Sequence, residues 1–292
     1  MPAKSKKTQT KTPTPALLPP KVDVVFKMLF GDKRNVNILK DFLEAVLHLE
    51  PNALKTIILR DPYLKKEYIE DKLSILDVKA ELLDGKIVDI EIQVKNIPEM
   101  RSRVTYYNAS MITEQIGEGG KYMDIKPAIS IIITNYPFIT ESKKCHTIFQ
   151  MLEKTERFQF NDLQEINVLD LTKIAAEKDE VLFDWLEFIK AEKEKDLMAV
   201  ATRRPAIKQA LNSLRQISAD KKNRAIYESR LKGQRDLWSI EDAAEARGEA
   251  RGRLEGEARA KQESAVIIAE KDNTLAEQAR RIAELERLLS RK

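Results

Sequence analysis

Apolar and polar residues alternate strictly along residues 73–95, and this alternation is the sharpest pattern in the chain. Apolar side chains fall mostly on one parity, whereas the other parity carries Asp77, Lys79, Glu81, Asp89, Glu91, Gln93 and Lys95. A period of two predicts two half-buried strands with one apolar and one polar face, joined by a turn near Asp84 and Gly85.

The apolar parity also restricts how these two strands pair. A two-residue turn would pair Leu83 with Lys86, and apolar residues of one strand would then face polar residues of the other. A three-residue loop over 83–85 keeps all the apolar residues on one face, which burial requires. We therefore predict this loop, with Gly85 in the left-handed conformation, and Asp77 directly opposite Glu91.

The remaining periodicities predict a mixed arrangement of helices and strands. Helical spacing covers 21–30, 36–47 and 98–117, and short apolar or β-branched runs mark strands at 55–60, 128–134 and 166–171. The run at 128–134 is apolar throughout, which is typical of a buried central strand. After about residue 175 the pattern is helical. These elements predict an α/β fold with a mixed sheet flanked by helices.

Composition changes at both ends of the chain. Residues 1–20 hold five of the eleven prolines together with several lysines, so we expect a disordered basic tail. From about 241 the chain is rich in Ala, Glu and Arg, and apolar residues recur every seven positions at Ile268, Leu275, Ile282 and Leu289.

This heptad spacing predicts a short coiled coil and a homo-oligomer, although Lys271 and Gln278 occupy core positions. A single helix is the alternative. We therefore divide the chain into a tail (1–20), an α/β domain (21–175), a helical extension (176–240) and a helix with coiled coil (241–292).

Charge and cysteine content narrow the chemistry. With 51 basic and 47 acidic residues, the chain can carry local basic patches but does not require a nucleic-acid partner. One cysteine and two histidines exclude a disulfide within the chain and a Cys/His zinc site. A catalytic metal would therefore be bound by carboxylates, which favours Mg²⁺ or Mn²⁺.

The same counts predict a cytoplasmic protein. A single cysteine suits a reducing compartment, and no run of 18 apolar residues predicts a membrane span. Cys145 and His146 are adjacent, but no Asp or Asn is placed to complete a triad, so we interpret His146 as structural.

Asp77 and Glu91 are the best candidates for chemistry. Two carboxylates held close together repel each other unless a proton or cation intervenes. A Mg²⁺ ion would remove this repulsion, lower the pKa of a bound water and stabilise charge on a phosphate. Gln93 shares their face and could orient the water, but an amide cannot act as a general base. The alternative is an ordinary solvated strand face.

Several stretches along 21–190 resemble one family when they are taken together. They are 23–31 (DVVFKMLFG), 76–78 (LDV), 90–93 (IEIQ), Arg103, Tyr106, Tyr107, Gln115, Tyr122, 126–129 (KPAI), His146 and 163–166 (LQEI). They resemble the Rpn-type recombination-promoting nucleases, also called transposases, of the PD-(D/E)XK nuclease superfamily. The resemblance implies a restriction-endonuclease-like core over 21–175 and a Mg²⁺-dependent DNA endonuclease.

The resemblance also implies roles for the hairpin residues. Asp77 and Glu91 would be metal ligands and the Ile92 carbonyl a third ligand. Gln93 stands where the superfamily has a lysine, and Asp23 is a candidate further carboxylate.

Because Gln93 carries no charge, the positive charge of the superfamily lysine must come from elsewhere. Lys27, Lys79 and Lys95 are candidates, and Lys79 fits an ordinary surface lysine better. Arg103 and Tyr106 are candidate DNA contacts, whereas Tyr107 lies on an apolar helix stripe and equally suits the core.

Two other functions remain open. One is a non-catalytic DNA-binding protein that retains the nuclease fold. The other is a coiled-coil assembly protein whose globular part is a scaffold.

Overall fold

The computed structural model describes residues 16–60, 77–97 and 99–289, which divide into two compact units between Glu228 and Ser229. The first unit contains a six-stranded sheet in the order β1-β2-β3-β4-β6-β5. Its strands are β1 (Ile57–Leu59), β2 (Val78–Leu82), β3 (Ile87–Gln93), β4 (Ala128–Thr134), β5 (His146–Gln150) and β6 (Gln164–Asp170). The α-helices are α1 (Asp23–Phe30), α2 (Val36–Val46), α3 (Met100–Thr113), α4 (Glu180–Lys190), α5 (Glu194–Ala201), α6 (Pro205–Ala219) and α7 (Lys221–Leu289).

The β2–β3 hairpin has the register that burial of its apolar residues requires. Val78 lies opposite Ile90, and the Leu82 N–H donates to the Lys86 carbonyl at 2.9 Å, which leaves a three-residue loop. Gly85 has φ of 88°, the left-handed conformation that glycine adopts without steric cost. The predicted loop and register are therefore confirmed for the described residues, which do not include 73–76.

The sheet is mixed, as predicted. Strands β3, β4 and β6 run parallel, whereas β1, β2 and β5 pair antiparallel with their neighbours. All seven residues of β4 are buried, which confirms a buried central strand. The pattern did not predict β5, because HTIFQ neither alternates nor forms a continuous apolar run.

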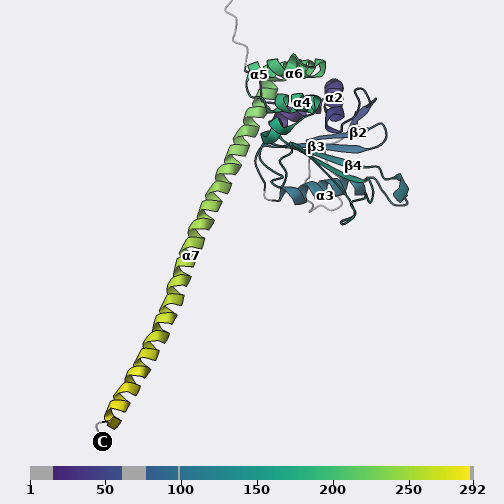
Figure 1. Ribbon diagram of the computed structural model, residues 1–292. Coiled ribbons are helices and arrows are strands. Elements are labelled where there is room, and N and C mark those ends of the chain that lie inside the picture. The colour runs from purple at the N-terminus through teal and green to yellow at the C-terminus, as the bar shows by residue number, and fades with distance from the viewer. Residues whose placement is uncertain (1–15, 61–76, 98, 290–292) are drawn as a thin grey trace, which may run out of the picture. The chain divides into compact units, whose positions relative to one another are not determined.

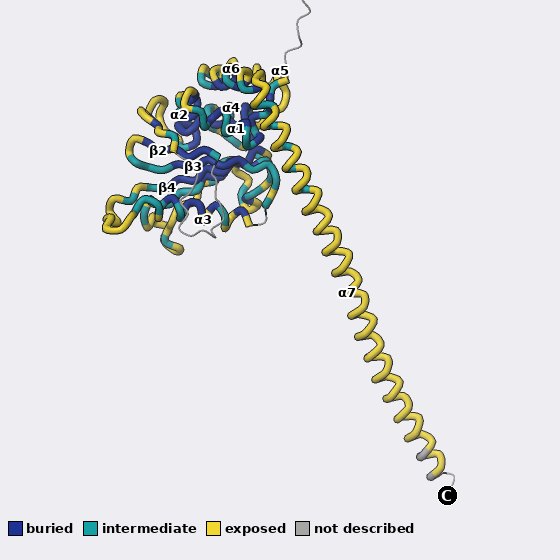
Figure 2. The backbone as a smooth tube through the Cα atoms, turned by 180° about the vertical axis from the view of Figure 1, so that it is seen from behind, coloured by how far each residue is buried: buried dark blue, intermediate teal, exposed yellow. Residues whose placement is uncertain are grey.

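Helices cover both faces of this sheet (Figure 1). Helix α3 lies on one face, α1, α2 and α4 lie on the other, and α6 lies over this second helical layer (Figure 2). The second layer is held by large aromatic side chains, including Phe30, Phe42 and Trp185, whose ring centroids lie 5.2 to 5.8 Å apart. Helix α6 thus packs on α1 and α2, and α4 packs on α2, within the first unit. The division at residue 175 between an α/β domain and a helical extension stays a prediction.

The expectation that β2 and β3 are half-buried is wrong. Lys79, Asp89 and Glu91, on the polar parity, are 7%, 0% and 2% exposed. Helix α3 packs on this face, where its Met100 and Val104 contact Ile132 of β4. The alternation therefore separates an apolar layer from a polar layer, and both lie under helices. Buried charges require partners, either other side chains or a bound ion. The polar layer is therefore the candidate functional site.

The second unit is formed by the greater part of α7. Gly248, Gly252 and Gly256 lie within this continuous helix. The heptad residues Ile268, Leu275, Ile282 and Leu285 are exposed, and the helix surface is exposed almost throughout (Figure 2). The side chain of Leu289 and residues 1–15 of the predicted tail lie outside the described residues. None of the described helices is long and apolar enough to cross a membrane.

Candidate functional site

The candidate site lies where the parallel strands end. Glu91 and Gln93 lie among the last three residues of β3, and Asp77 immediately precedes β2. Sheet register aligns Gln93 with Thr134 of β4, and Thr134 with Asp170 of β6. Binding sites of α/β sheets commonly form at the carboxyl ends of parallel strands.

Asp77 is held against β3 by a backbone hydrogen bond. The Ile92 N–H donates to Asp77 Oδ2 at 2.9 Å. Burial raises the pKa of Asp77 to about 7, the Ile92 N–H opposes this rise, and the negative charges of Glu91 and Asp23 add to it. Lys27 lowers the same pKa. The fold therefore brings Asp77, Glu91, Asp23 and Lys27 within electrostatic reach of one another.

The backbone of Ile92 points toward Asp77. In a strand, the N–H and C=O of one residue point to the same side, and those of the next residue point to the other side. The Ile92 N–H points to Asp77, and the Gln93 carbonyl accepts from Asn135 N–H on the β4 side at 3.0 Å. The Ile92 carbonyl thus lies on the same side of β3 as the Asp77 carboxylate.

Glu91 is buried and only partly paired. Its Oε1 accepts from Arg103 Nη2 at 3.0 Å and from Gln93 Nε2 at 3.3 Å. Its Oε2 is buried and has no hydrogen-bond partner within the described part of the chain. Burial raises the pKa of Glu91, against the opposing effects of Arg103 and Gln93.

Arg103 brings positive charge to Glu91. It reaches Glu91 from α3, and its guanidinium lies over the Tyr107 ring at 5.1 Å from the centroid. Lys79, by contrast, forms an ion pair with Glu114 at 2.7 Å and is buried. Our interpretation of Lys79 as a surface lysine is therefore wrong, because α3 covers it and Glu114 neutralises it.

Asp89 adds a third carboxyl group to this layer. It lies two residues before Glu91 on the same face and opposite Lys79. Burial holds the pKa of Asp89 well above its usual range, and the charges of Glu91 and Asp77 raise it further. Both carboxyl oxygens have no hydrogen-bond partner among the described residues. The neutral form of Asp89 is therefore favoured.

Tyr136 is a site residue that sequence reasoning missed. Its hydroxyl is buried, without a hydrogen-bond partner among the described residues. Burial raises the pKa of Tyr136 to about 12, and the charges of Glu91 and Asp170 contribute. It therefore remains a protonated hydrogen-bond donor near Glu91. Its place two residues after the central strand β4 was the available signal.

The other candidates lie at different depths. Tyr106 is 57% exposed on α3, whereas Tyr107 is buried, which confirms a place for Tyr107 in the core. Lys95 follows β3 and is half-buried. A DNA contact by Tyr106 and positive charge from Lys95 at the site both stay predictions.

Cys145 and His146 do not form a catalytic pair. The Cys145 thiol donates to the Asp170 carbonyl, and burial raises the pKa of Cys145 to about 12. The His146 ring bonds Asn167 Oδ1 at 2.8 Å and stacks on His48 at 5.2 Å between centroids. A thiol that stays protonated and faces a backbone carbonyl is not a nucleophile.

A cation at this site would need more than side-chain ligands. Within the described ranges, no set of three or more His, Cys, Asp and Glu side chains is arranged to hold a metal ion. Asp77 and Glu91 would need backbone oxygen and water as further ligands, as Mg²⁺ commonly uses.

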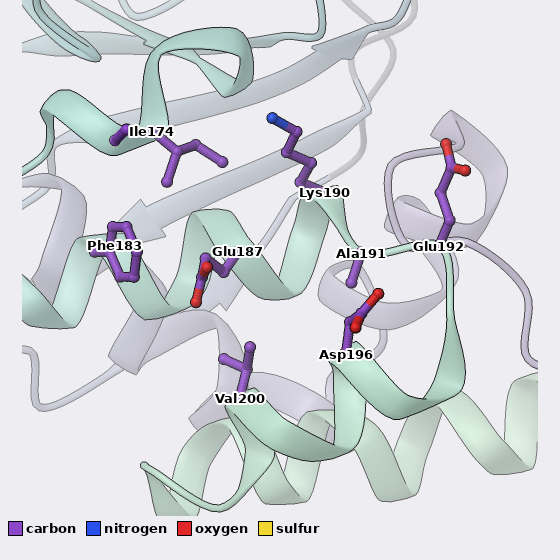
Figure 3. A pocket seen from close by; sticks show the side chains of 9 residues that line it. Ile174, Phe183, Glu187, Lys190, Ala191, Glu192, Asp196 and Val200 are labelled. Atoms are coloured by element: carbon purple, nitrogen blue, oxygen red, sulfur yellow. The ribbon is translucent and has the colours of Figure 1, made fainter.

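A separate surface pocket lies elsewhere in the first unit. It encloses about 680 Å³ between α4, α5 and the 3-10 helix Leu171–Ala176, with Phe183, Lys190 and Val200 among its lining (Figure 3). Three of its charged groups are paired, because Glu187 binds Arg203, Lys190 donates to the Leu171 carbonyl and Glu192 pairs with Lys21, and none of its lining residues has a buried polar atom without a partner among the described residues. This pocket therefore lacks the unsatisfied polar atoms of the β3 site.

The fold and site together define an α/β domain with paired carboxylates beside a β-hairpin. Residues 20–244 match a family described as PD-(D/E)XK nuclease family transposase. This match covers most of the chain, so the chain belongs to the PD-(D/E)XK nuclease family transposases. No curated protein and no solved structure matches the chain.

Proposed function

We propose that this protein is a metal-dependent DNA endonuclease that hydrolyses phosphodiester bonds. The observation that carries the proposal is the buried Glu91, whose Oε2 has no hydrogen-bond partner among the described residues, beside Asp77, whose pKa is raised to about 7. A buried carboxylate pair of this kind is costly unless a cation or protons neutralise it. Family membership supports the same reaction class.

A divalent cation fits these residues. Asp77, Glu91 and the Ile92 carbonyl would hold Mg²⁺, or Mn²⁺, because all three offer oxygen ligands. When bound, the ion would supply a water of lowered pKa and would offset negative charge on the phosphate.

The neighbouring side chains have separate proposed roles. Gln93 would position the attacking water, because its amide already donates to Glu91. Arg103 would hold Glu91 in place and favour binding of the phosphate, and Tyr136 would donate a hydrogen bond.

The surrounding residues would act on the cation or on the DNA. Lys27 and Lys95 would add positive charge, and Asp23 would add a carboxylate from α1. Exposed Tyr106 on α3 would contact the nucleic acid.

Nicking of supercoiled plasmid, with and without Mg²⁺, tests this proposal. We expect Mg²⁺-dependent nicking by the wild type and its loss in Asp77→Ala. The matched control is Asp84→Ala, which changes an exposed aspartate of the same hairpin. Metal-dependent nicking that survives Asp77→Ala would overturn the mechanism.

DNA binding measured on the same samples separates the rival functions. Binding by a folded wild type that does not nick DNA favours a non-catalytic DNA-binding protein. A folded protein that neither binds nor nicks favours a coiled-coil assembly protein.

We further propose that α7 joins copies of the chain through its heptad residues. Leu275 and Ile282 lie two helical turns apart and are 61% and 58% exposed, a surface that a partner helix would cover. Two copies would supply two sites for cutting two DNA strands. Leu275→Glu should weaken self-association of the full chain in sedimentation, whereas Asn273→Glu, away from the seam, should not. Equal association by both variants contradicts the coiled coil.

The biological role and the cellular location are part of the same proposal. A role in DNA transposition or recombination follows from the family description, and a cytoplasmic location follows from the single cysteine.

A further inference from the structure

The strand β5 presents an open edge of the sheet. It is the terminal strand in the sheet order and pairs with β6 alone among the described strands. An unpaired edge offers a row of backbone N–H and C=O groups to another strand. We propose that β5 pairs antiparallel with β5 of a second copy of this chain, so that the two sheets become continuous.

The ladder with β6 shows which backbone groups face outward. Asp170 N–H donates to the Cys145 carbonyl at 2.9 Å, in the register of the β5–β6 pair. Antiparallel pairs alternate between bonded and non-bonded, so Thr147 and Phe149 bond β6. His146, Ile148 and Gln150 therefore turn their N–H and C=O groups outward.

This edge lacks the features that normally prevent strand pairing. Residues 146–152 (HTIFQML) contain no proline, glycine, lysine, arginine or carboxylate. Ile148 and Phe149 are 48% and 44% exposed, on opposite faces of the strand. Natural edges are usually protected by charge, proline or bulges, and the other edge strand, β1, has only three residues.

Charge favours a second copy over DNA as the partner. Residues 146–152 themselves offer no cation to neutralise a phosphate, as nucleic-acid binding along the strand would require. Lys143 and Lys144 precede the strand, and Glu153 follows it. Antiparallel pairing of two identical strands brings the basic end of one beside the acidic end of the other.

A two-fold axis restricts the register of such a pair. Each residue must meet its symmetry-related partner across an isologous interface. With Ile148 opposite Ile148 of the partner copy, His146 faces Gln150, and all three outward-facing residues find bonding partners. This register also sets Lys143 opposite Glu153.

Disulfide trapping in the full chain tests this register. Ile148→Cys would place two thiols within the distance that a disulfide spans between antiparallel strands. The matched control is Ile58→Cys, on the other edge strand and similarly exposed at 46%. Under mild oxidation, Ile148→Cys should form covalent dimer roughly tenfold or more faster than the control, because pairing raises the effective thiol concentration. Equal rates would overturn the proposal.

Hydrogen exchange of the unmodified protein provides a test that does not depend on a variant. The amides of His146, Ile148 and Gln150 should lose their protection on dilution, while those of Thr147 and Phe149, bonded to β6, should keep it. This pattern distinguishes edge pairing from association through α7, which would leave β5 exchange unchanged. Exchange of the outward amides that does not depend on concentration contradicts the proposal, whether the true occupant is DNA, another protein or none.

Discussion

Arg103 Nη2 donates to Glu91 Oε1 at 3.0 Å, so a cation from α3 neutralises a buried carboxylate of β3. The resemblance to the superfamily implies a lysine on the strand itself, at the position of Gln93. In this chain, the positive charge reaches the same carboxylate from the helix that covers it. The site therefore depends on how α3 packs as well as on the hairpin.

Replacing Arg103 should impair cleavage more than folding. Arg103→Ala leaves Glu91 without its cation and free to reorient, so we expect nicking to fall by about 10- to 100-fold, as for other residues that orient a metal ligand. Arg103→Lys should restore part of the activity. The control is Arg101→Ala, because Arg101 is exposed and pairs with Glu141. Unchanged nicking by a folded Arg103→Ala would exclude this role.

The Tyr136 hydroxyl should matter for activity and little for stability. It has no hydrogen-bond partner among the described residues, so Tyr136→Phe removes no hydrogen bond that the described structure contains. Loss of one donor to the substrate or water should slow nicking about 5- to 10-fold, the equivalent of about 1 kcal/mol. The melting temperature should remain near that of the wild type. Tyr122→Phe, at an exposed position, is the control, and equal rates for both variants would contradict the role.

Asp77 should make the metal-free protein less stable at higher pH. Its pKa rises from 3.8 to about 7 on folding, so both states are protonated below about pH 4. Between about pH 4 and 7, the unfolded chain loses the proton while the folded protein keeps it, and the free energy of unfolding falls. Above about pH 7 this loss is complete.

Chemical unfolding in a metal chelator at two pH values checks this dependence. Between about pH 5 and 8, the wild type should lose up to about 3 kcal/mol more stability than Asp77→Asn. Asp84→Asn, an exposed change in the same hairpin, should follow the wild type. An Asp77→Asn profile that matches the wild type would show that Asp77 is not the titrating group.

The hairpin could be predicted in detail because its physical constraint is local. Apolar parity and one glycine determined the loop over 83–85 and the register that Val78 and Ile90 adopt. The burial of Lys79 could not be predicted in this way. It depends on α3 and on Glu114, 35 residues away, whose packing leaves no periodic trace on β2.

The rest of the site could not be predicted from the sequence either, because it depends on contacts between distant segments. The sequence predicts Arg103 as a DNA contact, but its bond to Glu91 depends on how α3 crosses the sheet. The place of Tyr136 two residues after β4 was the available signal, but no motif distinguishes a site residue there from a loop tyrosine. Strand β5 is exposed on both faces, so hydrophobic alternation could not reveal it.

The central claim is that Asp77 and Glu91 together hold the divalent cation that the reaction needs. Titration of Mn²⁺ into the chelator-treated protein, followed by electron paramagnetic resonance of the free ion, measures this directly. We expect the wild type and Asp84→Asn to bind Mn²⁺ alike, and Asp77→Asn and Glu91→Gln to lose at least about 10-fold in affinity. Wild-type affinity in both of these variants would contradict the claim.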